Sequence, residues 1–187
     1  MPADNLAPGK HVGPIFPDII FPLRRFTSLS ENRNVCFVCL GNIVRSPLAE
    51  HLFMHKAREK GIADQFQASS AGTSGWHVGE APDARMRQVA ARHGLVYDGR
   101  ARQFKPSDFD RYDLVVAMDT DNRNHLLGLA RSQDDRQKIL LFREYDSAGG
   151  PKASVPDPYY GGADGFEEVY HVIERSIEGL LESFEEG

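Results

Sequence analysis

The chain has 187 residues, a net charge of −5 and a pI near 5.8, with 41% hydrophobic and 26% charged residues. This length and composition suit one soluble globular domain. The acidic balance argues against a general nucleic-acid partner, and no apolar stretch is long enough to predict a membrane span. Only two cysteines, Cys36 and Cys39, are present. A secreted, disulfide-held protein is therefore disfavoured, and the cytoplasm is the expected location.

The N-terminal residues, 1–33, differ from the rest. Prolines at positions 2, 8, 14, 17 and 22 interrupt them, which excludes a long helix or a central strand. The segment lacks a basic start followed by an unbroken apolar block, so it is a poor secretory signal. We expect an irregular proline-rich arm, partly docked through its apolar residues or serving in oligomer formation.

From residue 34 onward, strand-like and helix-like segments alternate. Apolar runs predict strands over 34–39, 65–71, 112–119 and 138–142. Helices are expected over 47–60, 83–93 and about 120–130, the first with Pro47 at its first position. A last helix carries an apolar stripe from Phe166 to Phe184, opposite a face rich in glutamate.

This alternation predicts a three-layer α/β sandwich, with a central four-stranded parallel sheet flanked by helices. Ligands in such folds bind beyond the carboxyl ends of the strands. Cys39 stands at the carboxyl end of the first expected strand. The loop that follows it is therefore the candidate site.

That loop, CLGNIVRS, has the composition of an oxyanion site. A strand-to-helix loop directs its backbone N–H groups into one concavity, and Gly41 permits a tight turn. Arg45 can hold two phosphate oxygens with its planar guanidinium. The same field stabilises a thiolate, so we expect Cys39 to be a nucleophile, with Ser46 bonded to its sulfur. The expected phosphate-binding residues are Leu40, Gly41, Asn42, Ile43, Val44, Arg45 and Ser46.

A proton donor is also needed, because an ester oxygen leaves poorly unless it is protonated. Asp157 lies between two prolines in VPDPYYGG, where the backbone is restricted. Tyr159 and Tyr160 beside it could wall a pocket for a flat aromatic group. The expected reaction has two steps: Cys39 attacks phosphorus while Asp157 protonates the leaving oxygen, and water then hydrolyses the phosphocysteine. We expect no metal and no cofactor, because Arg45 and the loop N–H groups stabilise the charge.

Cys36 is interpreted as a small packing residue of the strand. An alternative is a thiol-redox or metal protein built on Cys36 and Cys39, but two cysteines without further ligands make a poor zinc site. His51 and His55 lie four apart and could be invoked as ligands. A solvated helix face is the simpler interpretation.

The motifs VCLGNIVRSPLAE and DPYYGG closely resemble those of the low-molecular-weight protein tyrosine phosphatases. The likeness continues through SSAGTSGWHVGEAPDARM, ARHGL and ARQFKPSDFDRYDLVVAMDTDN, in the order of the family. It covers about residues 34–185 and implies a single phosphatase domain over 34–187, with Cys39 as nucleophile, Arg45 as phosphate clamp and Asp157 as general acid.

The resemblance also assigns supporting residues. Asn42 and Ser46 would hold the loop and the thiolate, while Ser70 and His93 would support Asn42. Asp119 would position the arginine, and Trp76 would lie at the pocket rim. One position departs from the family pattern: Val44 stands where most members carry a second cysteine that protects the oxidised nucleophile as a disulfide.

Three other functions are alternatives to this one. A thioredoxin-coupled arsenate reductase would need two further cysteines. A protein arginine phosphatase tends to have threonine where this chain has Ile43, and a non-catalytic phosphate-binding module would not need every catalytic position filled. The expected partners are a phosphotyrosine-containing protein as substrate and inorganic phosphate as product, without nucleic acid or membrane. The expected assembly is a monomer or weak dimer.

Overall fold

The structure, a computed structural model, describes residues 32–150, 152–159 and 163–185, so nearly all of the expected arm lies outside it. In this part the strands are β1 (Arg33–Cys39), β2 (Phe66–Gly72), β3 (Leu114–Ala117) and β4 (Ile139–Leu141). The α-helices are α1 (Arg45–Glu59), α2 (Ala84–Arg92), α3 (Thr120–Leu129), α4 (Gln133–Gln137) and α5 (Ala163–Glu185). Short 3-10 helices span Ala63–Gln65, Pro106–Asp110 and Phe142–Tyr145.

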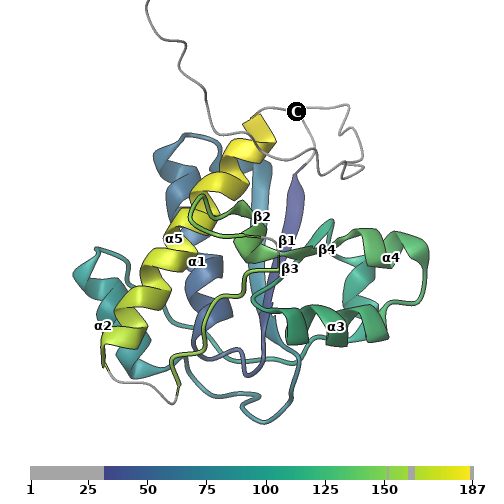
Figure 1. Cartoon of the computed structure of the whole chain (residues 1–187), viewed down its shortest axis with the longest axis horizontal. Helices are drawn as coiled ribbons and strands as arrows, with labels where there is room; N and C mark the ends of the chain where they lie inside the picture. Colours follow the sequence, from purple (N-terminus) through teal and green to yellow (C-terminus); the bar gives the residue numbers. More distant parts are fainter. Residues whose placement is uncertain (1–31, 151, 160–162, 186–187) are drawn as a thin grey trace, which may run out of the picture.

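The four strands form one parallel sheet in the order β2-β1-β3-β4 (Figure 1). β1 is an inner strand and pairs with β2 from Arg33 opposite Phe66 to Cys39 opposite Gly72. Because the strands are parallel, their carboxyl ends meet at one edge of the sheet. Cys39 ends β1 at that edge, as predicted.

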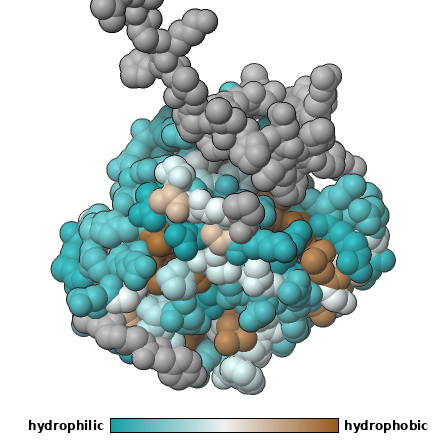
Figure 2. All heavy atoms as spheres, in the orientation of Figure 1, coloured by the Kyte–Doolittle hydropathy of each residue, from teal (hydrophilic) through white to brown (hydrophobic). Residues whose placement is uncertain are grey.

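Helices cover both faces of the sheet (Figure 1). On one face, α1, α2 and α5 enclose the larger core, to which Leu48, Met86 and Ile177 contribute. On the other face, Phe109 and Leu126 pack in a smaller core. These layers confirm the predicted α/β sandwich. The face of the molecule seen in Figure 2 is largely hydrophilic, with hydrophobic residues in small separate groups. Among the helices described, none is both long and apolar enough to cross a membrane.

Some boundaries differ from the prediction. α1 begins at Arg45, so Pro47 occupies its third position rather than its first. Proline is tolerated there because the first N–H groups of a helix have no intrahelical partner. β3 is shorter than the expected strand 112–119, because Asp119 caps α3 instead and accepts a hydrogen bond from Asn122 N at 2.7 Å. α4 was not predicted because its five polar residues carry no apolar stripe.

Candidate active site

The loop between β1 and α1 surrounds the sulfur of Cys39. Asn42 N donates a hydrogen bond to Cys39 Sγ at 3.2 Å, and Ser46 Oγ lies 3.0 Å from the sulfur. Cys39 is only 3% exposed, yet it lines a pocket of about 80 Å³. Other lining residues from the same loop are Leu40, Gly41, Ile43, Val44 and Arg45. A backbone N–H and a hydroxyl group therefore both contact the sulfur from within the loop.

The turn of this loop is made at Asn42. Its φ of 56° lies in the left-handed region, which asparagine adopts more readily than most residues with a side chain. Gly41, which was expected to supply the turn, has a different role. A Cβ atom at Gly41 would lie 2.9 Å from Cδ2 of His77, so the glycine allows His77 to approach the loop.

The side-chain amide of Asn42 ties the loop to the segments around it. Its Nδ2 donates to Ser46 Oγ at 3.0 Å and to Ser70 Oγ at 2.8 Å, while its Oδ1 accepts from Arg102 N at 2.9 Å. Ser70 lies on β2 and donates in turn to Glu50 Oε2 at 2.6 Å. The loop conformation is therefore held by hydrogen bonds from α1, β2 and the segment before β3.

His93 does not join this network, so its expected place beside Asn42 is wrong. His93 is the C-cap residue of α2; its Nε2 bonds to Glu167, and its ring stacks on Tyr170 with 4.1 Å between centroids. Asn42 has both amide hydrogens and its oxygen engaged by other groups. The packing of α2 against α5 decides the partner of His93.

Three contributors were not predicted: Glu50, Arg102 and His77. Glu50 lies four residues after Ser46 on α1, and this spacing places the two on one helix face. A helix-period search from the loop would have found Glu50. Arg102 contacts Asn42 through the backbone N–H of Arg102, and a side-chain pattern in the sequence cannot predict a backbone contact. His77 lines the pocket from a loop.

The guanidinium of Arg45 is buried and held from two sides. Nη1 donates to Asp119 Oδ2 at 2.6 Å and to Val155 O at 3.0 Å, and Nη2 donates to Asp157 Oδ2 at 2.8 Å. Burial works to lower the pKa of Arg45, but the negative charges of Cys39, Asp157 and Asp119 raise it overall. The group stays charged and fixed beside the sulfur.

Asp157 also lines the pocket, and its side chain is 40% exposed. Its Oδ2 faces Arg45, and its Oδ1 accepts from the backbone N of Tyr159 at 3.1 Å. Pro156 and Pro158 flank it, so the residue is oriented by a restricted backbone as well as by hydrogen bonds. The carboxyl group is therefore open to solvent while remaining next to the arginine.

The pocket rim is aromatic and open to solvent. Trp76 and Tyr159 line it and are 76% and 39% exposed, and Leu40 beside them is also exposed. The guanidinium of Arg85 lies 5.5 Å from the centre of the Tyr159 ring. Tyr160, the other expected rim residue, lies outside the described residues.

Cys36 is separated from the active site by the sheet. It is fully buried in the smaller core, whereas Cys39 belongs to the larger core on the other face. Burial raises the pKa of the Cys36 thiol to about 12, although the nearby charge of Arg102 opposes this. Both cysteines are free. The interpretation of Cys36 as a packing residue therefore holds.

The inner strand of this parallel sheet ends at a thiol that shares one pocket with an arginine and a carboxyl group, an arrangement suited to cysteine-dependent phosphoryl transfer. The family model described as low molecular weight phosphotyrosine protein phosphatase matches residues 34–187. The chain belongs to this family. The resemblance in its motifs and the expectation of an enzyme are thereby confirmed.

Individual relatives support the same family assignment. A low molecular weight protein-tyrosine-phosphatase of Streptomyces coelicolor is 48% identical over 153 residues, covering 81% of this chain and 93% of the relative. A low molecular weight phosphotyrosine protein phosphatase of Schizosaccharomyces pombe is 42% identical over 156 residues, which cover 83% of this chain and 99% of the relative. The crystal structure of a protein tyrosine phosphatase from Entamoeba histolytica matches with a TM-score of 0.79 at 36% identity, covering 83% of this chain and 99% of that one.

Proposed function

We propose that this enzyme hydrolyses phosphotyrosine in proteins, and aryl phosphate monoesters generally, through a phosphocysteine intermediate. The observation that carries this proposal is the convergence of Cys39, Arg45 and Asp157 on one pocket. Displacement at phosphorus needs a nucleophile, a cation to hold the phosphoryl oxygens and an acid for the leaving group. The relatives are named as protein-tyrosine phosphatases, and this supports the same substrate class.

In the first step, the thiolate of Cys39 attacks phosphorus. An S–P bond forms as the bond from phosphorus to the tyrosine oxygen breaks, and the carboxyl proton of Asp157 passes to that oxygen. The leaving group departs as a neutral phenol. Asp157 suits this role because it lines the same pocket as the sulfur and is partly exposed, so solvent can supply its proton.

In the second step, a water molecule attacks the phosphocysteine. Asp157, now a carboxylate, takes the proton of the water, and the S–P bond breaks to release inorganic phosphate and the Cys39 thiolate. Asn42 N–H and the Ser46 hydroxyl stabilise the returning negative charge on sulfur, because both lie within 3.2 Å of it. The nucleophile is thus also a good leaving group.

Charge stabilisation in both steps comes from the chain itself. Arg45 is fixed by Asp119 at 2.6 Å, so its planar face is oriented before substrate arrives and no reorganisation is needed in the transition state. Removing one such donor from an oxyanion site typically costs about 10²–10³ in kcat. The scheme uses only side chains and backbone N–H groups.

Selectivity for an aromatic ester follows from the rim. Trp76 and Tyr159 offer ring faces against which a phenyl group can stack above the sulfur. A phosphoprotein would present its phosphotyrosine to this opening.

We propose the cytoplasm as the location, because both cysteines are free in the structure. The proposed assembly is a monomer or weak dimer.

The test is hydrolysis of p-nitrophenyl phosphate in the presence of a chelator by the wild type, Cys39→Ser and Asp157→Ala, with Cys36→Ser as the matched cysteine control. We expect no turnover with Cys39→Ser and a reduced rate with Asp157→Ala. Retention of activity by Cys39→Ser would disprove the mechanism. A phosphotyrosine peptide and a phosphoarginine peptide should be compared in parallel; faster hydrolysis of phosphoarginine would replace the proposed substrate class.

A further inference from the structure

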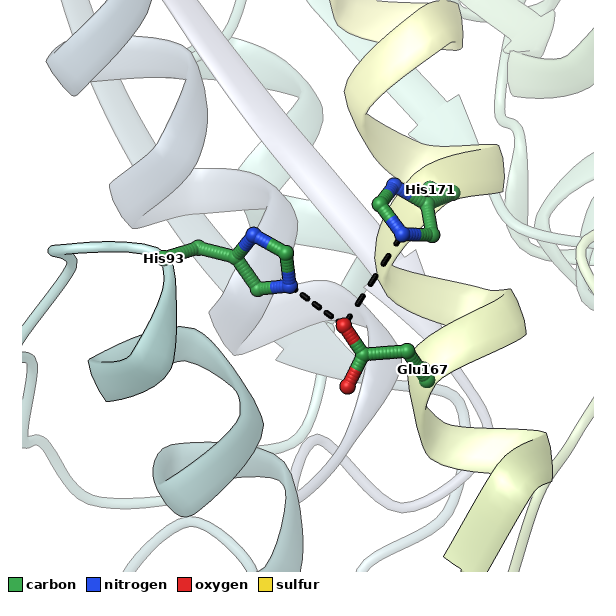
Figure 3. A group of neighbouring side chains, drawn as sticks. All are labelled: His93, Glu167 and His171. Carbon is green, nitrogen blue, oxygen red and sulfur yellow. Dashed lines mark hydrogen bonds and ion pairs between the residues drawn. The ribbon is translucent and has the colours of Figure 1, made fainter.

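Three side chains of types that can bind metals meet between α2 and α5 (Figure 3), and none of them lines the active-site pocket. His93 follows the end of α2, while Glu167 and His171 lie one helical turn apart on α5. One ligand atom from each residue lies within 4.8 Å of the others. The proposed phosphatase chemistry makes no use of this group.

The three donor atoms point toward one another. Glu167 Oε1 bonds to His93 Nε2 and lies 3.8 Å from His171 Nε2 (Figure 3). In a tetrahedral zinc site, ligand atoms are about 2.0–2.2 Å from the metal and hence about 3.3 Å from one another. A cation between them thus requires only small side-chain rotations. Two imidazoles and one carboxylate form a donor set that suits zinc and similar first-row divalent metals.

Neighbouring groups hold these side chains in place. His171 Nδ1 lies 3.5 Å from Glu174 Oε2, so the carboxylate can accept a hydrogen bond from Nδ1–H, which leaves the Nε2 lone pair for a metal. The ring of His93 stacks on Tyr170. Arg92 donates to Glu167 Oε2 at 2.6 Å, which leaves Oε1 as the oxygen that faces both imidazoles.

We propose that His93, Glu167 and His171 bind a divalent transition-metal cation such as Zn²⁺, which pins the end of α2 to α5. This site goes beyond the proposed function and departs from the expectation that the chain binds no metal. A cation that binds only the folded chain raises the stability of that fold. At its other end, α2 contacts the phosphate-binding loop, where Asp83 N donates a hydrogen bond to Ile43 O at 2.7 Å.

The test measures Zn²⁺ binding to the full chain after chelator treatment, by titration calorimetry. A Cys39→Ser background removes the active-site thiolate as a competing ligand. We expect His171→Ala and Glu167→Gln each to weaken binding by at least about 10-fold, a loss that even supporting residues cause. Glu174→Gln, which removes only the carboxylate beside His171 Nδ1, should weaken binding by a smaller factor.

His55→Ala is the matched control, since His55 also pairs with a glutamate on a helix, Glu59 at 3.4 Å, but does not belong to the cluster. The His55→Ala variant should bind Zn²⁺ with the same affinity as its Cys39→Ser parent. A second readout is Tm: added Zn²⁺ should raise it in the parent and in His55→Ala, and not in His171→Ala. Unchanged zinc affinity in either His171→Ala or Glu167→Gln would overturn the proposal, because the metal would then be bound elsewhere.

Discussion

Arg45 Nη2 donates a hydrogen bond to Asp157 Oδ2 at 2.8 Å, so the proposed phosphate clamp and the proposed general acid are joined directly. The two residues are 112 positions apart. A phosphate dianion that enters the pocket competes with the Asp157 carboxylate for this donor. Under the proposed mechanism, substrate binding would therefore free the oxygen of Asp157 that carries the proton to the leaving group.

The first prediction concerns the leaving group. Asp157→Ala should lower kcat/KM for phenyl phosphate by about 10²–10⁴-fold, the usual contribution of a general acid. The loss with p-nitrophenyl phosphate should be clearly smaller, because nitrophenolate leaves without protonation. Steady-state kinetics with both esters checks this, with Asp121→Ala on exposed α3 surface as control. Equal losses for the two esters would show that Asp157 is not the acid.

The second prediction separates two roles of Asp119, which holds Arg45 and also caps α3. Asp119→Asn removes the charge but keeps a good capping residue, whereas Asp119→Ala removes both. Each variant should lose about 10- to 100-fold in kcat/KM, corresponding to one charged hydrogen bond. Only Asp119→Ala should also lose about 1 kcal/mol of unfolding free energy, measured in urea. Wild-type kinetics in Asp119→Asn would contradict this account of Arg45.

The third prediction concerns oxidation of Cys39. Cys36 lies on the other face of the sheet, and Val44 occupies the position where the motif resemblance implies a second loop cysteine. Peroxide should therefore carry Cys39 beyond the sulfenic acid, to states that dithiothreitol does not reverse. Val44→Cys should recover more activity than the wild type after the same treatment, and Val44→Ala should not. Near-complete recovery of the wild type would count against the prediction.

The fourth prediction concerns Gly72 at the end of β2. A Cβ there would lie 2.7 Å from Leu40 O and 3.1 Å from Ser74 O, which are backbone atoms. Gly72→Ala must therefore displace the phosphate-binding loop and should lower both kcat/KM and Tm. Gly128→Ala is the control, because a Cβ at this α3 position meets nothing within 4 Å, and it should stabilise the protein by about 0.5–1 kcal/mol. Wild-type activity in Gly72→Ala would show that the loop tolerates the shift.

The fifth prediction concerns acid stability. The fully buried carboxylate of Asp146 accepts from Arg175 Nε at 2.9 Å and from Arg143 Nε at 3.1 Å. Burial works to raise the pKa of Asp146, but hydrogen bonds from Arg175, Ala148 N and Arg143 lower it overall. Its stabilisation is therefore present above the unfolded-state pKa, near 4, and is lost as the pH falls through the lower folded-state value.

Asp146→Asn should accordingly cost about 3 kcal/mol at pH 7, and the difference from the wild type should shrink below about pH 4. Urea unfolding at several pH values measures it. Asp110→Asn, in an exposed pair with Arg131, should change stability little at any pH. A difference for Asp146→Asn that is independent of pH would mean that the charge of Asp146 is not what stabilises the fold.

The sequence alone determined the local part of the site. Strand, loop and helix follow one another within residues 33–59, so the apolar run, the glycine and the arginine predict the anion loop, with Cys39 at its base. The faces of the strand were also predictable, since side chains alternate along it. This periodicity separates Cys36, in the smaller core, from Cys39.

Only the tertiary structure decided which distant groups meet. Asp157 could be proposed from its flanking prolines, but its contact with Arg45 depends on how the segment after β4 returns to the sheet edge. The partner of His93 was misplaced for the same reason, and the pairing of Glu50 with Ser70 on β2 likewise depends on tertiary packing. A polar side chain on a helix has several partners within reach, and the packing of α2 on α5, and of α1 on β2, selects one. The periodicity of a sequence indicates which face of a helix or strand is buried, whereas contacts between distant segments determine which partner each polar side chain takes.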